Sequence, residues 1–234
     1  MINYAHRGAS EYAPENTLMS FYLGLYMGAN GIETDVQKTK DNVLVLFHDD
    51  TLKRVTGEEG KISDYTFDEL KSFTVKNGNL EDKIISLEEF FERFASKDIT
   101  FAIELKTVGI ARETIEIIKK FNIQSKCIIT SFIFENLKEV KEIDSSIRVG
   151  YLLFYFDEKT LNEIKSINLY EVCPKADILD KMIVKYWKDK GYSVRAWGVQ
   201  NQKIMKKMVK IGVDGMTVNF PDKLTKILGR KENF

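Results

Sequence analysis

The strongest constraint on this fold is an alternation of short apolar runs with amphipathic segments, repeated eight times along the chain. The runs have the length and composition of buried strands, and the segments between them have the spacing of helices that cover a sheet. We expect strands at 2–6, 31–36, 100–106, 126–131, 148–153, 169–175, 192–199 and 215–220. We expect helices at 14–28, 86–95, 111–121, 134–143, 160–167, 180–191, 202–212 and 221–229.

Eight strand–helix units without a Pro/Gly/Ser-rich linker predict an α/β fold, a closed (β/α)8 TIM barrel, as one domain over residues 1–234. An open, doubly wound sheet is the main alternative, but the regular count of eight favours the barrel. A chain of 234 residues, 44% of them hydrophobic, can bury one full core.

One segment interrupts the alternation after the second expected strand. The run "NVLVLFHD" (42–49) is a ninth strand-like stretch, and the polar turn "KTKDN" before it predicts a hairpin with the second strand. Residues 51–85 then lack a clear strand–helix period. We interpret them as a small insertion that is too short to be an independent domain with its own core.

Composition excludes several classes of function. Lys+Arg and Asp+Glu both number 35, so there is no basic excess to bind nucleic acid. No apolar run approaches the length of a membrane span, and the first residues have neither the basic nor the apolar region of a signal peptide. We expect a cytoplasmic protein without stable membrane anchoring, in which Cys127 and Cys173 are buried, reduced thiols. The oligomeric state stays open, and a homodimer is one option.

The site of such a barrel forms at the C-terminal ends of its strands, and ionisable residues gather at the ends of the first three. These residues are His6 and Arg7 on the first expected strand, Glu33 and Asp35 on the second, and Glu104 and Lys106 on the third.

The spacing of the carboxylates points to a metal site. Glu33 and Asp35 are two residues apart, so both side chains face the same side of the strand, which in a barrel is the interior. Together with Glu104 they would repel one another strongly unless a cation lay between them. Oxygen-only ligands indicate a hard divalent ion, Mg²⁺ or Ca²⁺.

The chain has only two histidines, and both fall near these carboxylates. With the hairpin turn centred near Asp41, paired residue numbers sum to about 82 or 83, which places His48 across from Thr34 or Asp35. His6 lies one strand away. Two imidazoles suit proton transfer as base and acid, and Arg7 with Lys106 suits phosphate binding. The set predicts cleavage of a phosphate ester.

The motifs "AHRGAS…PENT", "GIETDVQKTKDNVLVLFHDDTLKRVTG", "FAIELK" and "GVDGMTVNFPD" resemble those of the glycerophosphodiester phosphodiesterases, a branch of the phospholipase-C-like barrel hydrolases. The resemblance runs from residue 4 to about residue 222. It implies a TIM barrel with a small insertion, and metal-dependent hydrolysis of small glycerophosphodiesters such as glycerophosphocholine or glycerophosphoethanolamine. The products would be glycerol 3-phosphate and an alcohol.

By position, the resemblance assigns roles to eight residues. His6 and His48 correspond to an acid–base pair; Glu33, Asp35 and Glu104 to metal ligands; Arg7 and Lys106 to phosphate contacts; and Trp197 to an aromatic residue near the glycerol.

Several questions stay open at this point. The attacking oxygen is either the glycerol 2-hydroxyl, which gives a cyclic phosphate, or water. A lysophospholipase D and a non-catalytic barrel that binds glycerophosphodiesters are the alternative functions. Residues 154–156, "FYF", are either part of the core or a lip for a choline group or an acyl chain. In "PENT", we expect Asn16 to cap the first helix.

Overall fold

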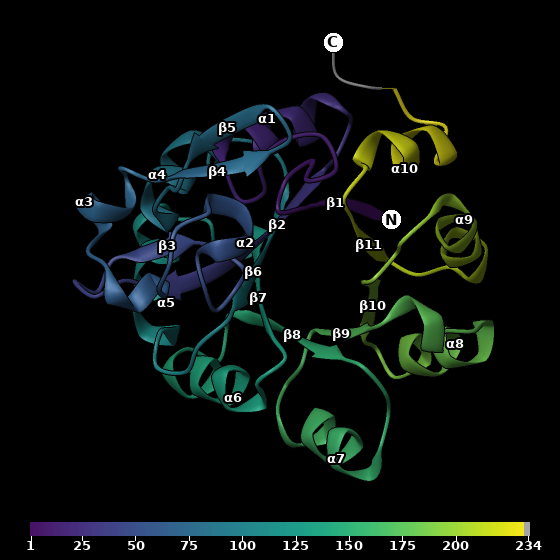
Figure 1. The fold of residues 1–234 in the computed structure, drawn as a ribbon. Coiled ribbons are helices and arrows are strands. Elements are labelled where there is room, and N and C mark those ends of the chain that lie inside the picture. The colour runs from purple at the N-terminus through teal and green to yellow at the C-terminus, as the bar shows by residue number, and fades with distance from the viewer. Residues whose placement is uncertain (232–234) are drawn as a thin grey trace.

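The chain closes into a ring of eight parallel strands in the computed structural model, which describes residues 1–231 (Figure 1). The ring strands are β1 (Ile2–His6), β2 (Gly31–Lys38), β6 (Thr100–Leu105), β7 (Cys127–Ser131), β8 (Arg148–Leu153), β9 (Glu171–Pro174), β10 (Ser193–Ala196) and β11 (Gly215–Val218). Strand β1 pairs with both β11 and β2, so the sheet is closed. This closure confirms the TIM barrel and rules out the open doubly wound sheet.

A helix follows each ring strand and lies outside the ring (Figure 1). These helices are α1 (Leu18–Tyr26), α4 (Leu87–Phe94), α5 (Ala111–Lys120), α6 (Phe134–Ile143), α7 (Glu158–Ser166), α8 (Lys181–Asp189), α9 (Gln202–Ile211) and α10 (Pro221–Ile227). Short 3₁₀ turns, η2 (Gln124–Lys126) and η3 (Ala176–Ile178), adjoin β7 and β9. Every strand and helix expected from the alternation is present, with ends shifted by a few residues.

Helix α4 illustrates how the sequence builds this outer layer. Its apolar residues recur with the helical period, and Phe90, Phe91 and Phe94 are fully buried. The rings of Phe90 and Phe91 pack edge-on against Phe101 of β6, with centroids 5.7 and 5.4 Å away. Ser86 caps the helix by accepting a hydrogen bond from the backbone of Glu89. The same division of apolar and polar faces recurs around the ring and forms the main core.

Residues between β2 and α4 form the insertion, which lies to one side of the ring in blue and teal in Figure 1. It contains β3 (Leu44–Leu46), α2 (Lys53–Thr56), η1 (Ile62–Asp64), α3 (Phe67–Leu70), β4 (Thr74–Asn77) and β5 (Leu80–Lys83). Strand β3 pairs antiparallel with β2, and each pair of residue numbers sums to 82, as the predicted hairpin requires.

The insertion packs around a small hydrophobic cluster. The cluster, which we call the insertion cluster, is separate from the main core. Its buried members are Val45, Phe47, Leu52, Val55, Ile62, Phe67, Leu70, Val75 and Ile84. Val45 and Phe47 lie before residues 51–85, so the cluster forms only where the segment folds back on β3. That the segment is too short to be an independent domain stays a prediction.

Two further expectations concern the thiols and the membrane. Cys127 and Cys173 are both free and buried, as predicted. Burial raises the pKa of Cys127 to about 12, so this thiol stays protonated and unreactive. Within residues 1–231, none of the helices combines the length and apolar character that crossing a membrane requires.

Candidate active site

Strand register brings ionisable residues of three neighbouring strands to one edge of the barrel. His6 is the partner of Glu33 across β1 and β2, and Asp35 is the partner of Glu104 across β2 and β6. Adjacent strands lie about 4.8 Å apart, so inward-facing side chains at paired positions converge. Carboxylate oxygens of Glu33, Asp35 and Glu104 lie within 4.8 Å of one another, and all three residues are buried.

This concentration of negative charge shifts the pKa values of the carboxyl groups. Burial and the nearby charges of Asp35 and Glu104 raise the pKa of Glu33 well above its usual range. Burial and the charge of Asp35 raise the pKa of Glu104 to about 7. Burial also opposes ionisation of Asp35, but the charges of Arg7, His48 and Lys106 and the hydrogen bond from Asn16 together outweigh it and lower the pKa of that carboxyl. Of the three carboxyl groups, Asp35 is therefore the one whose environment favours the ionised form.

The acid cluster satisfies the requirements of a hard divalent cation. Oδ1 of Asp35 is buried and has no hydrogen-bond partner among the described residues. Such an oxygen is costly to leave unpaired, and a cation at this point would satisfy it. Three carboxylates also form the oxygen-rich donor set that Mg²⁺ and Ca²⁺ prefer. The residues predicted as metal ligands thus lie together in a geometry that fits the ion.

Two cationic side chains border the carboxylates. Nε of Arg7 lies 3.2 Å from Oδ2 of Asp35, and Nζ of Lys106 donates to Oε1 of Glu104 over 3.0 Å. Both side chains are mostly buried, with 15% and 17% of their surface exposed. Ionic partners within a partly enclosed pocket hold both groups in place, where they can also meet an anion.

The two histidines approach the acid cluster from different elements. Nδ1 of His6, at the end of β1, donates to Oδ1 of Asn219 over 2.5 Å, and its Nε2 lies 3.8 Å from Oε2 of Glu33. Burial and the charge of Arg7 lower the pKa of His6 to about 4. The ring is therefore neutral at physiological pH in the cation-free protein, and its Nε2 can accept a proton.

His48 follows β3 at the level of the carboxylates. The backbone amide of Phe47 donates to the carbonyl of Asp35 over 3.0 Å. The hairpin contact with β2 therefore extends to the residue just before His48. Nδ1 of His48 lies 2.6 Å from Oδ1 of Asp49, and 32% of the His48 side chain is exposed. Both histidines and the three carboxylates are thus brought together, as the strand-end analysis and the hairpin register predicted.

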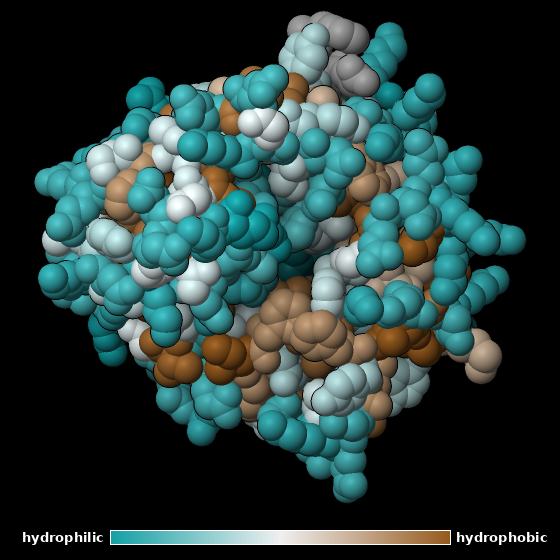
Figure 2. Space-filling view, in the orientation of Figure 1, coloured by the Kyte–Doolittle hydropathy of each residue, from teal (hydrophilic) through white to brown (hydrophobic). Residues whose placement is uncertain are grey.

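A cavity of about 590 Å³ opens at this edge of the barrel. Its charged side is formed by residues of β1, β2, β6 and the segment after β3. Its other side is formed by aromatic residues that follow β7, β8 and β10. Figure 2 shows the central hollow, with teal surface on the side of the insertion and a brown and tan rim near β8.

Three aromatic rings make the apolar side of the cavity. Phe132 and Phe154 stack with centroids 5.0 Å apart, and Trp197 packs edge-on against them at 5.1 and 5.0 Å. The indole Nε1 of Trp197 donates to two backbone carbonyls, over 3.2 and 3.0 Å, which holds the ring in one orientation. Of residues 154–156, Phe154 alone lines the cavity, and Phe156 instead packs against the core residue Trp187 at 5.4 Å.

The structure corrects the role expected for Asn16. Thr17, not Asn16, caps α1, and its side chain accepts from the backbone of Ser20. Asn16 has a positive φ of 57° and turns its amide inward. Nδ2 donates to Oδ2 of Asp35 over 3.0 Å, and Oδ1 accepts from Thr34 over 2.7 Å. Asn16 therefore orients a proposed metal ligand, and this left-handed turn favours an asparagine.

Comparison with known proteins places these residues in a family. The model of the glycerophosphoryl diester phosphodiesterase family matches residues 6–223. The chain belongs to this family. A glycerophosphodiester phosphodiesterase of Caldanaerobacter subterraneus subsp. tengcongensis is 33% identical, with 96% of both chains covered. One from Bacillus altitudinis is 31% identical, with 96% of both chains covered.

Solved structures of the family share the whole fold. A phosphodiesterase of Oleispira antarctica, determined in complex with the product sn-glycerol-3-phosphate, is 26% identical. It superposes with a TM-score of 0.87 over 97% of this chain and 96% of its own. A glycerophosphodiester phosphodiesterase of Thermotoga maritima is 29% identical, with a TM-score of 0.81 and coverage of 97% and 98%. The chain is thus an enzyme of the phosphodiesterase family.

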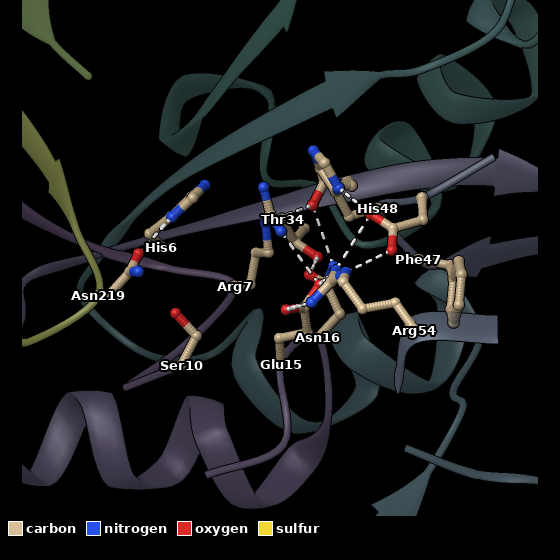
Figure 3. A network of polar contacts seen from close by, with 12 residues as sticks. His6, Arg7, Ser10, Glu15, Asn16, Thr34, Phe47, His48, Arg54 and Asn219 are labelled. Atoms are coloured by element: carbon tan, nitrogen blue, oxygen red, sulfur yellow. Dashed lines mark hydrogen bonds and ion pairs between the residues drawn. The ribbon is translucent and has the colours of Figure 1, made fainter. Parts of the chain in front are cut away.

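Sequence reasoning missed several residues that contact the site. Glu15 lies in the quoted "PENT" motif, Asn219 in "GVDGMTVNFPD", and Arg54 in "TLKRVTG", but none received a role. Figure 3 shows that Glu15 and Arg54 join a network of polar contacts with Arg7 and His48. The signal that was available is their place in the motifs, because nothing in the strand periodicity brings a residue of the insertion to the barrel mouth.

Proposed function

We propose that this enzyme hydrolyses small glycerophosphodiesters to glycerol 3-phosphate and an alcohol. The observation that carries the proposal is the convergence of two imidazoles, a buried carboxylate triad and two cationic side chains on one cavity. The product seen with the Oleispira antarctica relative supports the glycerol 3-phosphate half of the substrate. Two histidines that line the same cavity support proton transfer, and therefore catalysis, over binding alone.

Glu33, Asp35 and Glu104 would hold a divalent cation, Mg²⁺ or Ca²⁺. A cation bound by these residues supplies Lewis acidity, which neutralises charge on phosphoryl oxygen and lowers the pKa of a nearby hydroxyl. Asn16 and Arg7 fix the orientation of the Asp35 carboxylate through hydrogen bonding and charge. Oδ1 of Asp35 supports this assignment, because it is buried without a hydrogen bond from the described residues and its ion-pair partner, Nζ of Lys106, is 3.9 Å away.

Arg7 and Lys106 would bind the phosphate oxygens. Guanidinium groups match two phosphate oxygens at once, and an ammonium adds a point charge. Arg7 follows β1 and Lys106 follows β6, on either side of β2, and both groups border the carboxylate cluster, so a phosphate that contacts both would lie within reach of the histidines. Charge of this kind, held in place before the substrate arrives, stabilises the transition state without reorganisation.

His6 and His48 would divide the proton transfers between them. One ring takes the proton of the attacking oxygen, and the other gives a proton to the alcohol that leaves. In each ring Nδ1 is held by a partner, Asn219 or Asp49, which leaves Nε2 free for the reaction. The attacking oxygen is either the glycerol 2-hydroxyl or water, and a substrate that lacks the 2-hydroxyl separates the two routes.

The aromatic rings of Phe154 and Trp197 would contact the non-phosphate parts of the substrate. Aromatic faces bind both the carbon face of a polyol and a quaternary ammonium group. Trp197 is fixed by its hydrogen bonds and would pack on glycerol, whereas Phe154, 55% exposed, stands at the rim. The exposed ring of Phe154 is the observation that favours the alternative lysophospholipase D reaction, because an acyl chain of a lysolipid would cover it.

A panel assay tests the proposal. The enzyme is supplied with glycerophosphocholine, glycerophosphoethanolamine and lysophosphatidylcholine, each with Mg²⁺, Ca²⁺ or a chelator, and glycerol 3-phosphate and the free alcohols are measured. We expect glycerol 3-phosphate from the two deacylated substrates, only when a divalent cation is present. Preferential turnover of the lysolipid would favour the lysophospholipase D, and turnover of all substrates with chelator would contradict the metal assignment.

A further inference from the structure

Arg54, in helix α2 of the insertion, contacts two carboxylates, one from the segment after β1 and one from the segment after β3 (Figure 3). Its Nη1 and Nη2 donate to the two oxygens of Glu15 over 2.9 and 2.7 Å. Its Nε and Nη2 donate to the two oxygens of Asp49 over 2.5 and 3.1 Å. One guanidinium therefore makes two forked ion pairs, an arrangement that fixes direction as well as distance.

Each of these carboxylates also contacts a residue to which we assign a role in the reaction. Oε1 of Glu15 accepts from Nη1 of Arg7 over 3.0 Å, and Arg7 in turn lies against Asp35. Oδ1 of Asp49 lies 2.6 Å from Nδ1 of His48. Arg54 is thus linked through Glu15 to Arg7 and through Asp49 to His48, and it contacts neither of these two residues directly.

The charge state of Asp49 decides which nitrogen of His48 carries the proton. An ionised carboxylate can only accept, so Nδ1 must be the donor and Nε2 the free nitrogen. Burial opposes ionisation of Asp49, but the hydrogen bonds from Arg54 and His48 outweigh it and lower the pKa of that carboxyl. Burial likewise opposes ionisation of Glu15, whose pKa Arg54 and Arg7 lower.

We propose that Arg54 is a positioning residue, which holds Asp49 and Glu15 so that His48 presents Nε2, and Arg7 its guanidinium, to the phosphate. The proposal rests on the acid–base role proposed above for His48. It extends the part of the insertion in the reaction beyond His48, because the residue that orients both His48 and Arg7 comes from helix α2.

A purely structural role, in which Arg54 only fastens the insertion to the barrel, is already filled by other contacts. Leu52 and Val55, on either side of Arg54, are buried in the insertion cluster. At the far end of the insertion, Asn77 donates to the carbonyls of Ser10 and Ala13 over 3.1 and 3.2 Å. The Arg54 side chain itself is 51% exposed. Its removal should therefore leave the segment in place.

The variant Arg54→Ala tests the proposal, with Lys53→Ala as its matched control. Lys53 is the neighbouring residue of α2, and its ion pair is with the exposed Glu59 rather than with Glu15 or Asp49. For Arg54→Ala we expect kcat to fall about 10-fold to 100-fold, as for other partners that orient a working imidazole. Lys53→Ala should keep kcat, and Arg54→Lys, which keeps the charge but loses the fork, should recover part of it.

A spectroscopic readout separates positioning from general damage. The chain has only two histidines, so ¹⁵N-histidine NMR shows each ring separately, and a His6→Ala sample assigns them. We expect the Nδ1–H tautomer of His48 in the wild type and in Lys53→Ala, and a mixture with the Nε2–H tautomer in Arg54→Ala. An unchanged tautomer in Arg54→Ala, or an unchanged kcat, would overturn the proposal.

Failure of the proposal and failure of the proposed function can be told apart. If His48→Ala retains wild-type turnover, the acid–base assignment is wrong, whatever the spectra show. If His48→Ala is inactive while Arg54→Ala keeps both its tautomer and its turnover, the assignment of His48 stands and the role of Arg54 is refuted.

Discussion

Asn219 and His6 join the end of the last ring strand to the end of the first through a hydrogen bond of 2.5 Å. Because Oδ1 of Asn219 accepts from Nδ1, the His6 ring presents Nε2 to the cavity. We expect Asn219→Ala to lower kcat about 10-fold to 100-fold, since the ring loses the partner that orients it. Steady-state kinetics checks this. Asp180→Ala is the control, because Asp180 caps α8 and does not line the cavity, and its loss should affect stability but not kcat.

Removing either histidine should lower kcat by about 10²-fold to 10⁴-fold with a natural substrate. The p-nitrophenyl ester of glycerol 3-phosphate then identifies the acid, because a nitrophenolate leaves without being protonated. His6→Ala and His48→Ala are compared on both substrates. The variant that lacks the general acid should regain much of its rate on the nitrophenyl ester, and the variant that lacks the base should not. Equal impairment of both variants on both substrates would contradict the division of roles.

Cation binding should depend steeply on pH. The pKa of Glu104 is raised from 4.5 to about 7 by burial and by Asp35, so the folded cation-free protein retains a proton that the unfolded chain has lost. Stability of the cation-free protein therefore falls as pH rises from 4.5 through 7. A divalent cation bound by this cluster would replace the proton, and its affinity should drop about 10-fold per pH unit below 7.

Calorimetric melting with Mg²⁺, with Ca²⁺ and with chelator, at pH 5 and pH 8, checks this dependence. Either effective cation should raise the melting temperature more at pH 8. Glu104→Gln should weaken the effect at pH 8 and reduce its dependence on pH. An equal shift at both pH values would mean that the cation does not displace a proton from this cluster.

A stability prediction concerns the interior of the ring. Arg195 is fully buried, and its Nε donates to Oε2 of Glu171 over 2.9 Å. We expect Glu171→Ala to lower the free energy of unfolding by about 3–5 kcal/mol, because it leaves a buried guanidinium without its counter-ion. Urea unfolding followed by tryptophan fluorescence measures the change. The double variant Glu171→Ala/Arg195→Met should be more stable than Glu171→Ala alone, and the reverse order would refute the argument.

Much of the fold and of the site was predictable because both depend on short periods in the sequence. Alternation along β2 places Glu33 and Asp35 on one face of the strand. The parallel register of β2 and β6 then places Glu104 beside Asp35. The hairpin was predictable as well, because a short turn leaves few registers, and the observed sum of 82 is one of the two expected. His48 could be placed at the level of the carboxylates for this reason.

The contacts that the sequence did not predict depend on turns and loops whose backbone follows no regular period. The positive φ of Asn16 directs its amide to Asp35, a contact that helix-capping preferences do not anticipate. Arg54 reaches the barrel mouth because the insertion folds back toward the ring, which no periodicity encodes. The aromatic run 154–156 divides between cavity and core at a bend after β8, so Phe154 and Phe156 have different surroundings.

The insertion cluster, which is separate from the main core, bears on the order in which activity and fold are lost on heating. It shares no buried member with the main core, so it can open as a local unit while the ring stays closed. Opening would release Phe47 and, with it, the backbone contact that sets the position of His48. Thermal inactivation should therefore precede loss of the circular-dichroism signal, and activity should return on cooling as quickly as a small segment repacks.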